Sequence, residues 1–392
     1  MLTASGHAAS DKGKKAIRND DAFAVADNLG LYMVADGMGG HAGADVAARL
    51  AVDTAMKRLY ADEAKLTAIR KGLGPMSQLK ALAVAAVQAA NTAVHSAATS
   101  SAEHRGMGAA LTVLLVADGR AVTAHVGHCR LYLCRDGLIH QLSTDHTIVS
   151  ELLASGYLTP AEAEAHPFRN TLTRAIGSQA SVKVDTLSFD VLPDDRLLLC
   201  TDGIWTTVPN ARWLAAQISG QPDVAAAALV THAGHVETDD DSTAVIVSVV
   251  QAEPDPGTDR RNLHVSLSLI ALRSMFLFER LDHVSLTRVL NAARVRIHEA
   301  GSTVVHAGED HEQLVIIVDG QFALTDGGQD HGDLGPGDYI GETTLLAPRA
   351  ARATLTATTG GSTLNLSHDE FTALIRRHPQ LGVSLLARLA AH

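Results

Sequence analysis

Three aspartates stand at the ends of apolar, strand-like runs, where their carboxylates would meet at one edge of a sheet. Asp36 and Asp202 each close such a run and are followed at once by glycine, and Asp240 stands just before the run AVIV. A strand that ends there turns its carboxylate into a cleft, while the glycine lets the backbone turn and exposes a carbonyl. A single Asp-Gly pair is typical of a plain turn, so the prediction depends on the three occurring together.

Three converging carboxylates repel one another unless cations neutralise them. Ligand sets made only of oxygen select hard ions, so the pattern predicts Mg²⁺ or Mn²⁺ rather than zinc. Two such ions about 4 Å apart activate a bridging water as hydroxide and hold a phosphate for in-line attack. The aspartates therefore predict a metal-dependent hydrolase of phosphate esters.

The elements that position these residues are short β runs in the first 250 residues, with long alanine-rich segments between them. Strands are expected at 31–36, 110–119, 121–127, 130–137, 185–192, 196–202 and 244–250. Asp-Gly pairs at 118–119 and 136–137 predict hairpin turns, and residues 42–60 and 76–98 have the apolar spacing of helices. Hairpins with inserted helices favour an α+β fold with antiparallel sheets over a Rossmann fold.

The composition is that of a globular protein. Of the 392 residues 46% are apolar, which is enough for substantial cores, and the length suggests two or three domains. The net charge of −11 argues against nucleic acid and against an anionic membrane as partners. Three cysteines without metal-ligand spacing, and an N-terminus without the apolar core of a signal peptide, lead us to expect a soluble cytoplasmic protein.

The sequence changes character near residue 251. Residues 251–262, QAEPDPGTDRRN, combine proline, glycine and charge without apolar periodicity, and they are predicted to be a linker. We therefore expect one domain over residues 5–250 and a second over residues 263–392.

The first domain carries a series of motifs along the chain. They are Asn19-Asp20-Asp21, Asp36-Gly37-Met38-Gly39-Gly40-His41, Gly106-Met107-Gly108, Val126-Gly127, Arg130-Leu131-Tyr132, Asp145-His146, residues 150–177, Thr201-Asp202-Gly203 and Asp240-Asp241-Ser242-Thr243. The series resembles the PP2C (PPM) family of metal-dependent protein serine/threonine phosphatases in its bacterial form. The resemblance implies an αββα sandwich, with two antiparallel sheets flanked by helices and a dinuclear metal site at one end. It also implies a phosphorylated Ser/Thr protein as substrate, modified by a cognate kinase.

Position by position, the resemblance implies a ligand set for two ions. The ligands are the carboxylates of Asp20, Asp21, Asp36, Asp202 and Asp240 and the carbonyl of Gly37. Asp36 would bridge both ions, whereas Asp20 and Asp21 would act directly or through bound water. Asp240 is preferred within the acidic run 239–241, and its two neighbours stay open as alternatives.

Two positions depart from the family. The arginine that grips the substrate phosphate falls on Ala16, so Arg18 or Lys15 would have to replace it, although a bidentate guanidinium is not freely relocated. His128 stands where bacterial members have the aspartate of a third metal position, and it is either a loop residue or a ligand that suits Mn²⁺. His41 is a candidate proton donor to the leaving oxygen, with a packing role as the alternative.

These departures leave two hypotheses for the first domain. One is a phosphatase that uses two Mn²⁺ or Mg²⁺ ions, with residues 150–168 as a mobile flap or a plain surface helix pair. The other is a pseudophosphatase that binds a phosphoprotein or an effector without useful turnover. Hydrolysis of a phosphate ester by the first domain, with and without Mn²⁺, would distinguish them.

The second domain has short β runs separated by glycine-rich turns, which predict a small antiparallel barrel or roll. An entry helix is expected over 275–293 and a final helix over 368–390. The stretch resembles the cyclic-nucleotide-binding (CRP/FNR-like) β-roll in the segments Val318-Asp319-Gly320, Gly335-Pro336-Gly337-Asp338, Gly341-Glu342 and Arg352-Ala353-Thr354.

In binding-competent members of that family, a Gly-Glu pair opens a short helix that receives the phosphate, the glutamate holds the ribose and an arginine pairs with the phosphate. Here Gly341 and Glu342 are present, and Arg352 is the candidate arginine, one residue from the family position. On a strand such a slip turns a side chain to the other face, and Arg349 is the alternative. We therefore expect weak or absent binding of cAMP and cGMP, with a docking or dimerisation role as the other possibility.

Overall fold

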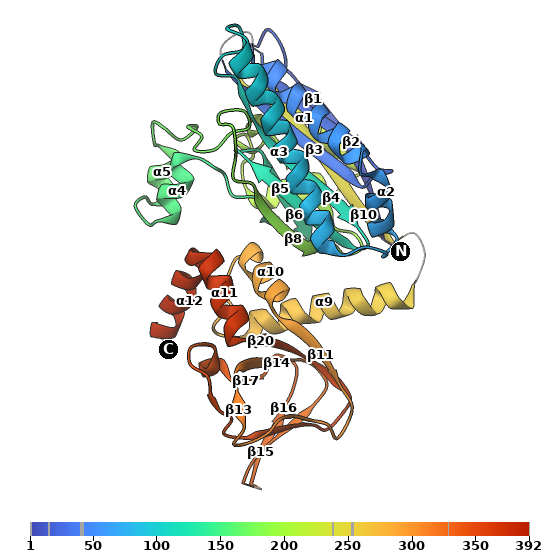
Figure 1. Ribbon diagram of the computed structural model, residues 1–392, viewed down its shortest axis with the longest axis vertical. Coiled ribbons are helices and arrows are strands. Elements are labelled where there is room, and N and C mark those ends of the chain that lie inside the picture. Colours follow the sequence, from blue (N-terminus) through green and yellow to red (C-terminus); the bar gives the residue numbers. More distant parts are fainter. Residues whose placement is uncertain are drawn as a thin grey trace. The chain divides into compact units, whose positions relative to one another are not determined.

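The computed structural model describes residues 2–14, 16–39, 43–236, 239–251, 255–327 and 329–391. Contacts divide the chain into a first unit, Met1–Pro254, and a second unit, Asp255–His392. Figure 1 colours the first unit from blue to yellow and the second from yellow to red. None of the described helices combines the length and the apolar character that crossing a bilayer requires.

One sheet of the first unit carries the long alanine-rich helices. In spatial order its antiparallel strands are β2 (Asp21–Ala26), β3 (Leu31–Met38), β4 (Gly108–Ala117), β5 (Arg120–Val126) and β8 (Asp185–Asp190). Its helices are α1 (Ala44–Tyr60), α2 (Glu63–Arg70) and α3 (Met76–Ser100). α1 and α3 lie side by side on the sheet, and the small alanines of their buried faces allow this close packing (Figure 1).

The other sheet of the first unit joins segments from both ends of that unit. In spatial order its strands are β1 (Leu2–Asp11), β10 (Ser242–Gln251), β9 (Arg196–Cys200), β6 (Arg130–Arg135) and β7 (Leu138–Gln141). The helices that pack on it are α7 (Ala211–Ile218) and α8 (Pro222–His235). Strand β10 contacts β2 and β3, and every residue of β4 is buried, as expected where two sheets stack between helix layers. The predicted αββα sandwich is confirmed.

Both predicted Asp-Gly hairpins are confirmed. Asp118 and Gly119 join β4 to β5 with φ of 48° and 67°, and Asp136 and Gly137 join β6 to β7 with φ of 53° and 74°. Positive φ at both central residues is the type I′ geometry that matches the twist of the strands.

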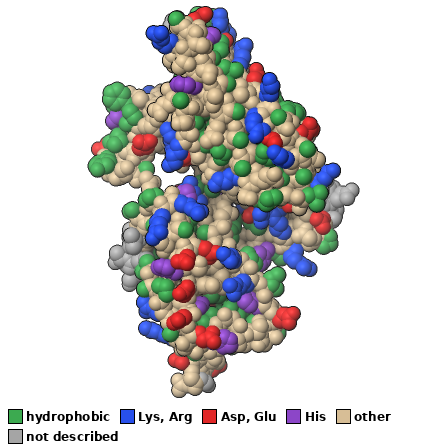
Figure 2. All heavy atoms as spheres, in the orientation of Figure 1, with side chains coloured by type: hydrophobic (Ala, Val, Ile, Leu, Met, Phe, Trp, Pro, Cys, Tyr) green, Lys and Arg blue, Asp and Glu red, His purple; other side chains and the backbone are tan. Residues whose placement is uncertain are grey.

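The segment predicted to be a flap is a pair of short helices. They are α4 (Ile148–Ala154) and α5 (Pro160–Glu164), and a capping box between Thr159 and Glu162 fixes the start of α5. Tyr157 is 80% exposed and Phe168 57%, and Figure 2 shows hydrophobic side chains gathered over this segment. The surface helix pair is what the structure shows, and its motion stays a prediction.

The second unit is a β-roll with helices before and after it. Its sheets are β11 (Arg294–His298)–β20 (Gly361–Ser367)–β14 (Gln313–Asp319)–β17 (Tyr339–Ile340), β12 (Thr303–Val305)–β19 (Thr354–Ala357)–β15 (Phe322–Asp326)–β16 (Gln329–Leu334), and the short pair β13 (Asp310–His311)–β18 (Arg349–Ala350). Its helices are α9 (Pro256–Ser274), α10 (His283–Ala292), the 3-10 helix η1 (Glu342–Leu345), α11 (His368–Arg377) and α12 (Pro379–Ala391). Apolar side chains of β12, β14, β15 and β19 meet in the interior of the roll. The predicted antiparallel roll is confirmed.

The predicted linker over 251–262 differs from the structure. Its last residues, 256–262, form the first turns of α9, because the Asp255 side chain accepts the N–H of Gly257 and Pro256 occupies the first helical position. Gln251 belongs to β10. Residues 252–254 lie outside the described residues.

Both predicted helices of the second unit are wrong in their boundaries. The first half of 275–293 forms turns, and α10 begins only after Asp282, whose side chain accepts the N–H of Ser285. The helix predicted over 368–390 is divided into α11 and α12 at Pro379, which cannot continue α11 because its nitrogen has no hydrogen to donate.

Candidate functional site

Asp21 and Asp36 face each other across the β2–β3 hairpin, where they are directly paired in register. Paired residues of an antiparallel hairpin project from the same face, so the two carboxylates lie side by side. Burial raises the pKa of both carboxyls well above the usual value, and the charge of Asp202 raises both further. The hairpin therefore presents two carboxylates that a proton or a cation must neutralise.

Asp202 reaches the same place from the other sheet. It is the first residue of α6 (Asp202–Trp205), a short helix that follows β9 directly. Its Oδ1 is buried and has no hydrogen-bond partner among the described residues. The preceding Thr201 joins three strands, because its hydroxyl donates to Asp21 Oδ2 at 2.8 Å and accepts the N–H of Thr243 at 3.0 Å. No local pattern in the sequence predicts this positioning role of Thr201.

Two neighbouring aspartates before β10 have different partners. Asp241 is 4% exposed, and its oxygens accept the N–H of Gly13 at 2.7 Å and that of Asp20 at 2.5 Å. Burial, followed by the charge of Asp202, raises the pKa of Asp240 to about 6. Since backbone donors occupy Asp241, the geometry favours Asp240 as the metal-binding carboxylate. The carboxylate cluster therefore comprises Asp21, Asp36, Asp202 and Asp240.

Two glycines permit the close approach of these segments. A Cβ atom on Gly37 would lie 2.0 Å from the Ala44 carbonyl oxygen, and one on Gly203 would lie 2.0 Å from the Asp241 carbonyl oxygen. Any larger residue would push the segments apart. The Gly37 N–H also donates to the Asp20 carbonyl at 3.0 Å, so the backbone of the predicted carbonyl ligand is anchored.

The rim of the cluster carries the candidate phosphate-binding arginine. The Arg18 side chain is 62% exposed, and its Nη1 lies 3.6 Å from Asp45 Oδ2. Burial and the neighbouring acidic charges raise the pKa of Asp20, whereas Arg18 lowers it. Arg18 therefore lies beside the cluster and keeps donors exposed to solvent. The other candidates, Lys15 and His41, lie outside the described residues.

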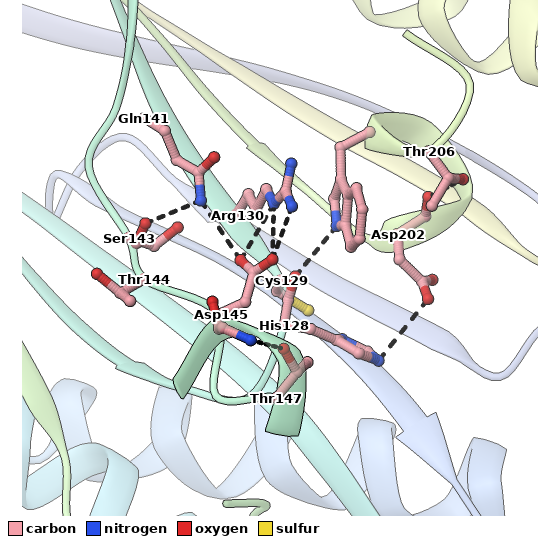
Figure 3. A network of polar contacts seen from close by, with 12 residues as sticks. His128, Cys129, Arg130, Gln141, Ser143, Thr144, Asp145, Thr147, Asp202 and Thr206 are labelled. Carbon is pink, nitrogen blue, oxygen red and sulfur yellow. Dashed lines mark hydrogen bonds and ion pairs between the residues drawn. The ribbon is translucent and has the colours of Figure 1, made fainter. Parts of the chain in front are cut away.

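His128 lies in the loop that joins β5 to β6, and Figure 3 shows its ring directed toward Asp202. Its Nδ1 is 3.8 Å from Asp36 Oδ2 and its Nε2 is 3.8 Å from Asp202 Oδ2. Nδ1 is buried and has no hydrogen-bond partner within the described ranges. The sulfur of the fully buried Cys129 lies within 4.8 Å of ligand atoms of Asp36 and His128. Of the two interpretations of His128, the geometry favours the ligand.

A network of polar contacts supports the His128 loop (Figure 3). Trp205 donates its Nε1–H to the His128 carbonyl at 3.1 Å. The Arg130 guanidinium stacks on the Trp205 ring, 3.5 Å from its centroid, and forms a bidentate ion pair with Asp145 at 3.1 and 2.7 Å. Gln141 approaches the same carboxylate at 3.4 Å. Sequence analysis did not find these contacts, because no local pattern predicts them.

The second unit contains a pocket of about 280 Å³ in which the predicted nucleotide-binding residues come together. Its lining includes Gly341, Glu342, Arg349 and Arg352. Gly341 has a φ of 81° at the start of η1, a conformation that favours glycine. Residues 349–353 all line this pocket, and 351–353 lie between β18 and β19, outside the strands, so the argument from strand alternation does not apply to Arg352. The direction of the Arg352 side chain stays a prediction.

The donor set of the first unit fits divalent metal ions. Carboxylates converge from both sheets, and the buried Oδ1 of Asp202 lacks a partner among the described residues. Buried acceptors without a donor and mutually raised pKa values cost free energy, and a bound cation would relieve both. Oxygen ligands of this kind are those that hard cations prefer.

An αββα sandwich whose sheets meet at a carboxylate cluster is the architecture expected of the metal-dependent protein phosphatases. The family model described as Protein phosphatase 2C matches residues 10–231 of the chain, and the one described as Cyclic nucleotide-binding domain matches residues 295–378. The first match covers more than half of the chain. The chain therefore belongs to the protein phosphatase 2C family, and its first unit is a protein serine/threonine phosphatase domain.

Curated proteins and solved structures agree with this assignment. The serine/threonine phosphatase stp of Listeria monocytogenes is 35% identical over 204 residues, which cover 51% of this chain and 78% of that protein. The Mycobacterium tuberculosis phosphatase PstP/Ppp aligns with a TM-score of 0.57 and 30% identity, over 64% of this chain and 100% of that one. The catalytic domain of PstP in complex with two manganese ions aligns with a TM-score of 0.54 and 28% identity, over the same shares of both chains.

Proposed function

We propose that the first unit hydrolyses phosphoserine and phosphothreonine in proteins with two divalent ions, Mn²⁺ or Mg²⁺, at the carboxylate cluster. The convergence of buried carboxylates from both sheets carries the proposal. Burial and mutual repulsion raise the pKa of Asp21, Asp36 and Asp240, which is the electrostatic state expected of a cation site without its cation. The two manganese ions in the PstP structure support it further.

The proposed ligands keep the roles that the resemblance implies. They are the carboxylates of Asp20, Asp21, Asp36, Asp202 and Asp240 and the carbonyl of Gly37. Asp36 is the proposed bridging ligand, because its cross-strand partner is Asp21 and His128 links it to Asp202. When bound, the ions would lower the pKa of a water held between them and so supply the nucleophile at neutral pH.

Residues at the rim would bind the substrate. Arg18 is exposed beside Asp20, so its guanidinium is proposed to bind the phosphate oxygens. His41 is proposed to give a proton to the leaving oxygen, on the resemblance alone. The substrate class, a protein with phosphorylated Ser or Thr, rests on the names of the relatives as serine/threonine phosphatases, and its modification by a cognate Ser/Thr kinase rests on the resemblance alone.

Hydrolysis of p-nitrophenyl phosphate and of a phosphothreonine peptide by the full chain tests the proposal. We expect activity with Mn²⁺ or Mg²⁺, none in EDTA, and a loss of at least about a hundredfold in Asp36→Asn and Asp202→Asn, because each removes a charged ligand. Asp53→Asn is the matched control, since Asp53 is exposed on α1. Full activity in EDTA, or in either ligand variant, would overturn the metal assignment.

The pseudophosphatase hypothesis is favoured by one specific observation, the alanine at position 16 in place of the family arginine. It predicts that the Mn²⁺-loaded chain binds a phosphothreonine peptide but releases no phosphate. Turnover in the assay above contradicts it. Ala16→Arg separates the hypotheses further, because it should be neutral or activating in an enzyme.

We propose that the second unit is a regulatory β-roll. The match to cyclic-nucleotide-binding domains and the pocket between Glu342 and Arg352 support a ligand-sensing role. Docking of a protein partner is the alternative that the sequence leaves open. A change in phosphatase activity on addition of a pocket ligand would distinguish sensing from docking.

A further inference from the structure

We propose that His128 is a nitrogen ligand of the divalent ion held by Asp202, and that it makes this site prefer Mn²⁺ and Co²⁺ to Mg²⁺. The inference rests on the proposed function and deepens it, because it concerns the ion preference of the same site. It depends on the position of the imidazole, on the support of its loop and on the chemistry of nitrogen ligands.

The imidazole faces two carboxylates at separations that suit an ion rather than a hydrogen bond. Its Nε2 lies 3.8 Å from Asp202 Oδ2 and its Nδ1 lies 3.8 Å from Asp36 Oδ2. Hydrogen bonds between such atoms are about 2.7–3.2 Å long. An ion with bonds of about 2.1 Å to a nitrogen and an oxygen holds these atoms roughly 3.0–4.2 Å apart, depending on the angle between the bonds.

The 3.8 Å separation from Asp202 Oδ2 selects Nε2 as the nitrogen that binds the ion of Asp202. Asp202 Oδ1 and His128 Nδ1 are both buried without a hydrogen-bond partner in the described part of the chain. With Nε2 bound to the ion of Asp202, the ring proton is on Nδ1, which faces Asp36 Oδ2 at 3.8 Å, a separation longer than a hydrogen bond.

The loop holds His128 from both sides. Gly127 has a φ of 109°, and a Cβ on it would lie 2.3 Å from the Ala110 side chain. The Gly127 N–H donates to His146 Nδ1 at 3.0 Å, and its carbonyl accepts the His146 N–H at 2.8 Å. On the other side Trp205 binds the His128 carbonyl. A ligand anchored in this way needs little reorganisation to bind an ion.

A nitrogen ligand changes which divalent ion the site prefers. Mg²⁺ dehydrates reluctantly and is bound mainly by oxygen. Affinity for a mixed nitrogen–oxygen site increases along the series of transition metals from Mn²⁺ through Co²⁺. The imidazole of His128 therefore shifts the ion preference of the site away from Mg²⁺. An aspartate in place of His128 would give a ligand set made only of oxygen and reverse this shift.

Pulsed EPR of the Mn²⁺-loaded full chain tests the inference directly. With ¹⁵N only in histidine, we expect hyperfine coupling of a histidine nitrogen to Mn²⁺, and we expect His128→Asp to lose it. Titration calorimetry should show that the ratio of the dissociation constants for Mg²⁺ and Mn²⁺ decreases at least about tenfold in His128→Asp. Cys129→Ala is the matched control, because it removes the neighbouring sulfur and should keep both the coupling and the ratio.

The outcomes separate this inference from the proposed function. A wild-type chain that binds Mn²⁺ without histidine coupling overturns the role of His128, and this measurement needs no variant to fold. Coupling that persists in His128→Asp, or a preference that only Cys129→Ala removes, overturns it as well. A wild-type chain that binds Mn²⁺ with histidine coupling but hydrolyses no phosphate ester contradicts the proposed function and leaves the ligand assignment supported.

Discussion

At the scale of single residues, the hydrogen-bond partners and neighbouring charges of a side chain determine its role more than its residue type does. Asp240 and Asp241 are identical neighbours, yet Asp241 is saturated by the backbone N–H groups of Gly13 and Asp20, and Asp240 faces the charge of Asp202. Sequence analysis preferred Asp240 by resemblance alone. The reason becomes visible only when Gly13 and Asp20 are brought beside Asp241 by the fold.

Replacing Asp241 by alanine should destabilise the protein. The Gly13 N–H would be left buried without an acceptor, and two charge-assisted hydrogen bonds would be lost. We expect the free energy of unfolding in urea to decrease by about 2–4 kcal/mol. Asp241→Asn keeps one acceptor oxygen and should lose less. An Asp241→Ala protein as stable as wild type would show that the backbone contacts contribute nothing.

Removing the Arg18 side chain should impair substrate binding. We expect kcat/KM of Arg18→Ala for a phosphopeptide to decrease by about tenfold, since loss of a charge-assisted contact costs about 1.5–3 kcal/mol. Arg212→Ala, an exposed arginine on α7, serves as the control. An inactive Lys15→Ala beside a fully active Arg18→Ala would move the role to Lys15.

At the scale of elements, the hairpin turns that the sequence predicted have local signals, whereas β1, which it missed, depends on a distant partner. In the Asp118-Gly119 and Asp136-Gly137 turns, the two residues themselves determine the backbone geometry. β1 was missed because LTASGHAASD has no apolar alternation, and its register with β10 is set more than 200 residues later. In the same way the carboxylates at strand ends were predictable, whereas the contact of Trp205 with the His128 loop was not.

The ion pair between Arg130 and Asp145 should contribute far more than a surface pair. Asp145 is 8% exposed, so Arg130→Ala leaves a buried carboxylate without its ion-pair partner, and we expect a loss of about 3–5 kcal/mol in the free energy of unfolding. Arg120 pairs with Asp190 across the edge of the sheet and is half exposed. Arg120→Ala should therefore cost less than about 1 kcal/mol. Equal losses in the two variants would refute a structural role of the network.

At the scale of the whole molecule, one chain combines a phosphatase unit with a β-roll, and the aspartates of the phosphatase unit repel one another at the proposed metal site. Figure 2 shows Lys and Arg side chains interspersed with other residues on the visible face, with no continuous basic area.

Stability of the metal-free chain should decrease as the pH rises through about 6. The pKa of Asp240 is raised from 3.8 to about 6 in the folded chain, so the folded state binds more protons than the unfolded state between these values. The contribution of the Asp240 carboxyl to the free energy of unfolding is complete below about pH 4 and is lost above about pH 6. We expect the difference in Tm between pH 5 and pH 7.5 to shrink in Asp240→Asn but not in Asp53→Asn. Added Mn²⁺ should reverse the loss at pH 7.5.

The full chain should bind cAMP and cGMP with a Kd above about 10 μM, which corresponds to about 7 kcal/mol. Arg349 and Arg352 line the pocket but are exposed, so a phosphate would have to order two solvated side chains beside the charge of Glu342. Titration calorimetry measures this. A tighter Kd that Arg352→Ala abolishes would show that the pocket is a nucleotide sensor.

The pairing of Asp21 with Asp36 also constrains how the chain folds. A slip of one residue between β2 and β3 would turn one carboxylate to the opposite face, and a slip of two would separate them by about 7 Å. An ion that requires both carboxylates binds only the correctly aligned hairpin, so its binding free energy favours that alignment alone. Binding of the proposed ions would therefore select the correct strand register, and the ligands needed for catalysis would also disfavour a misaligned sheet.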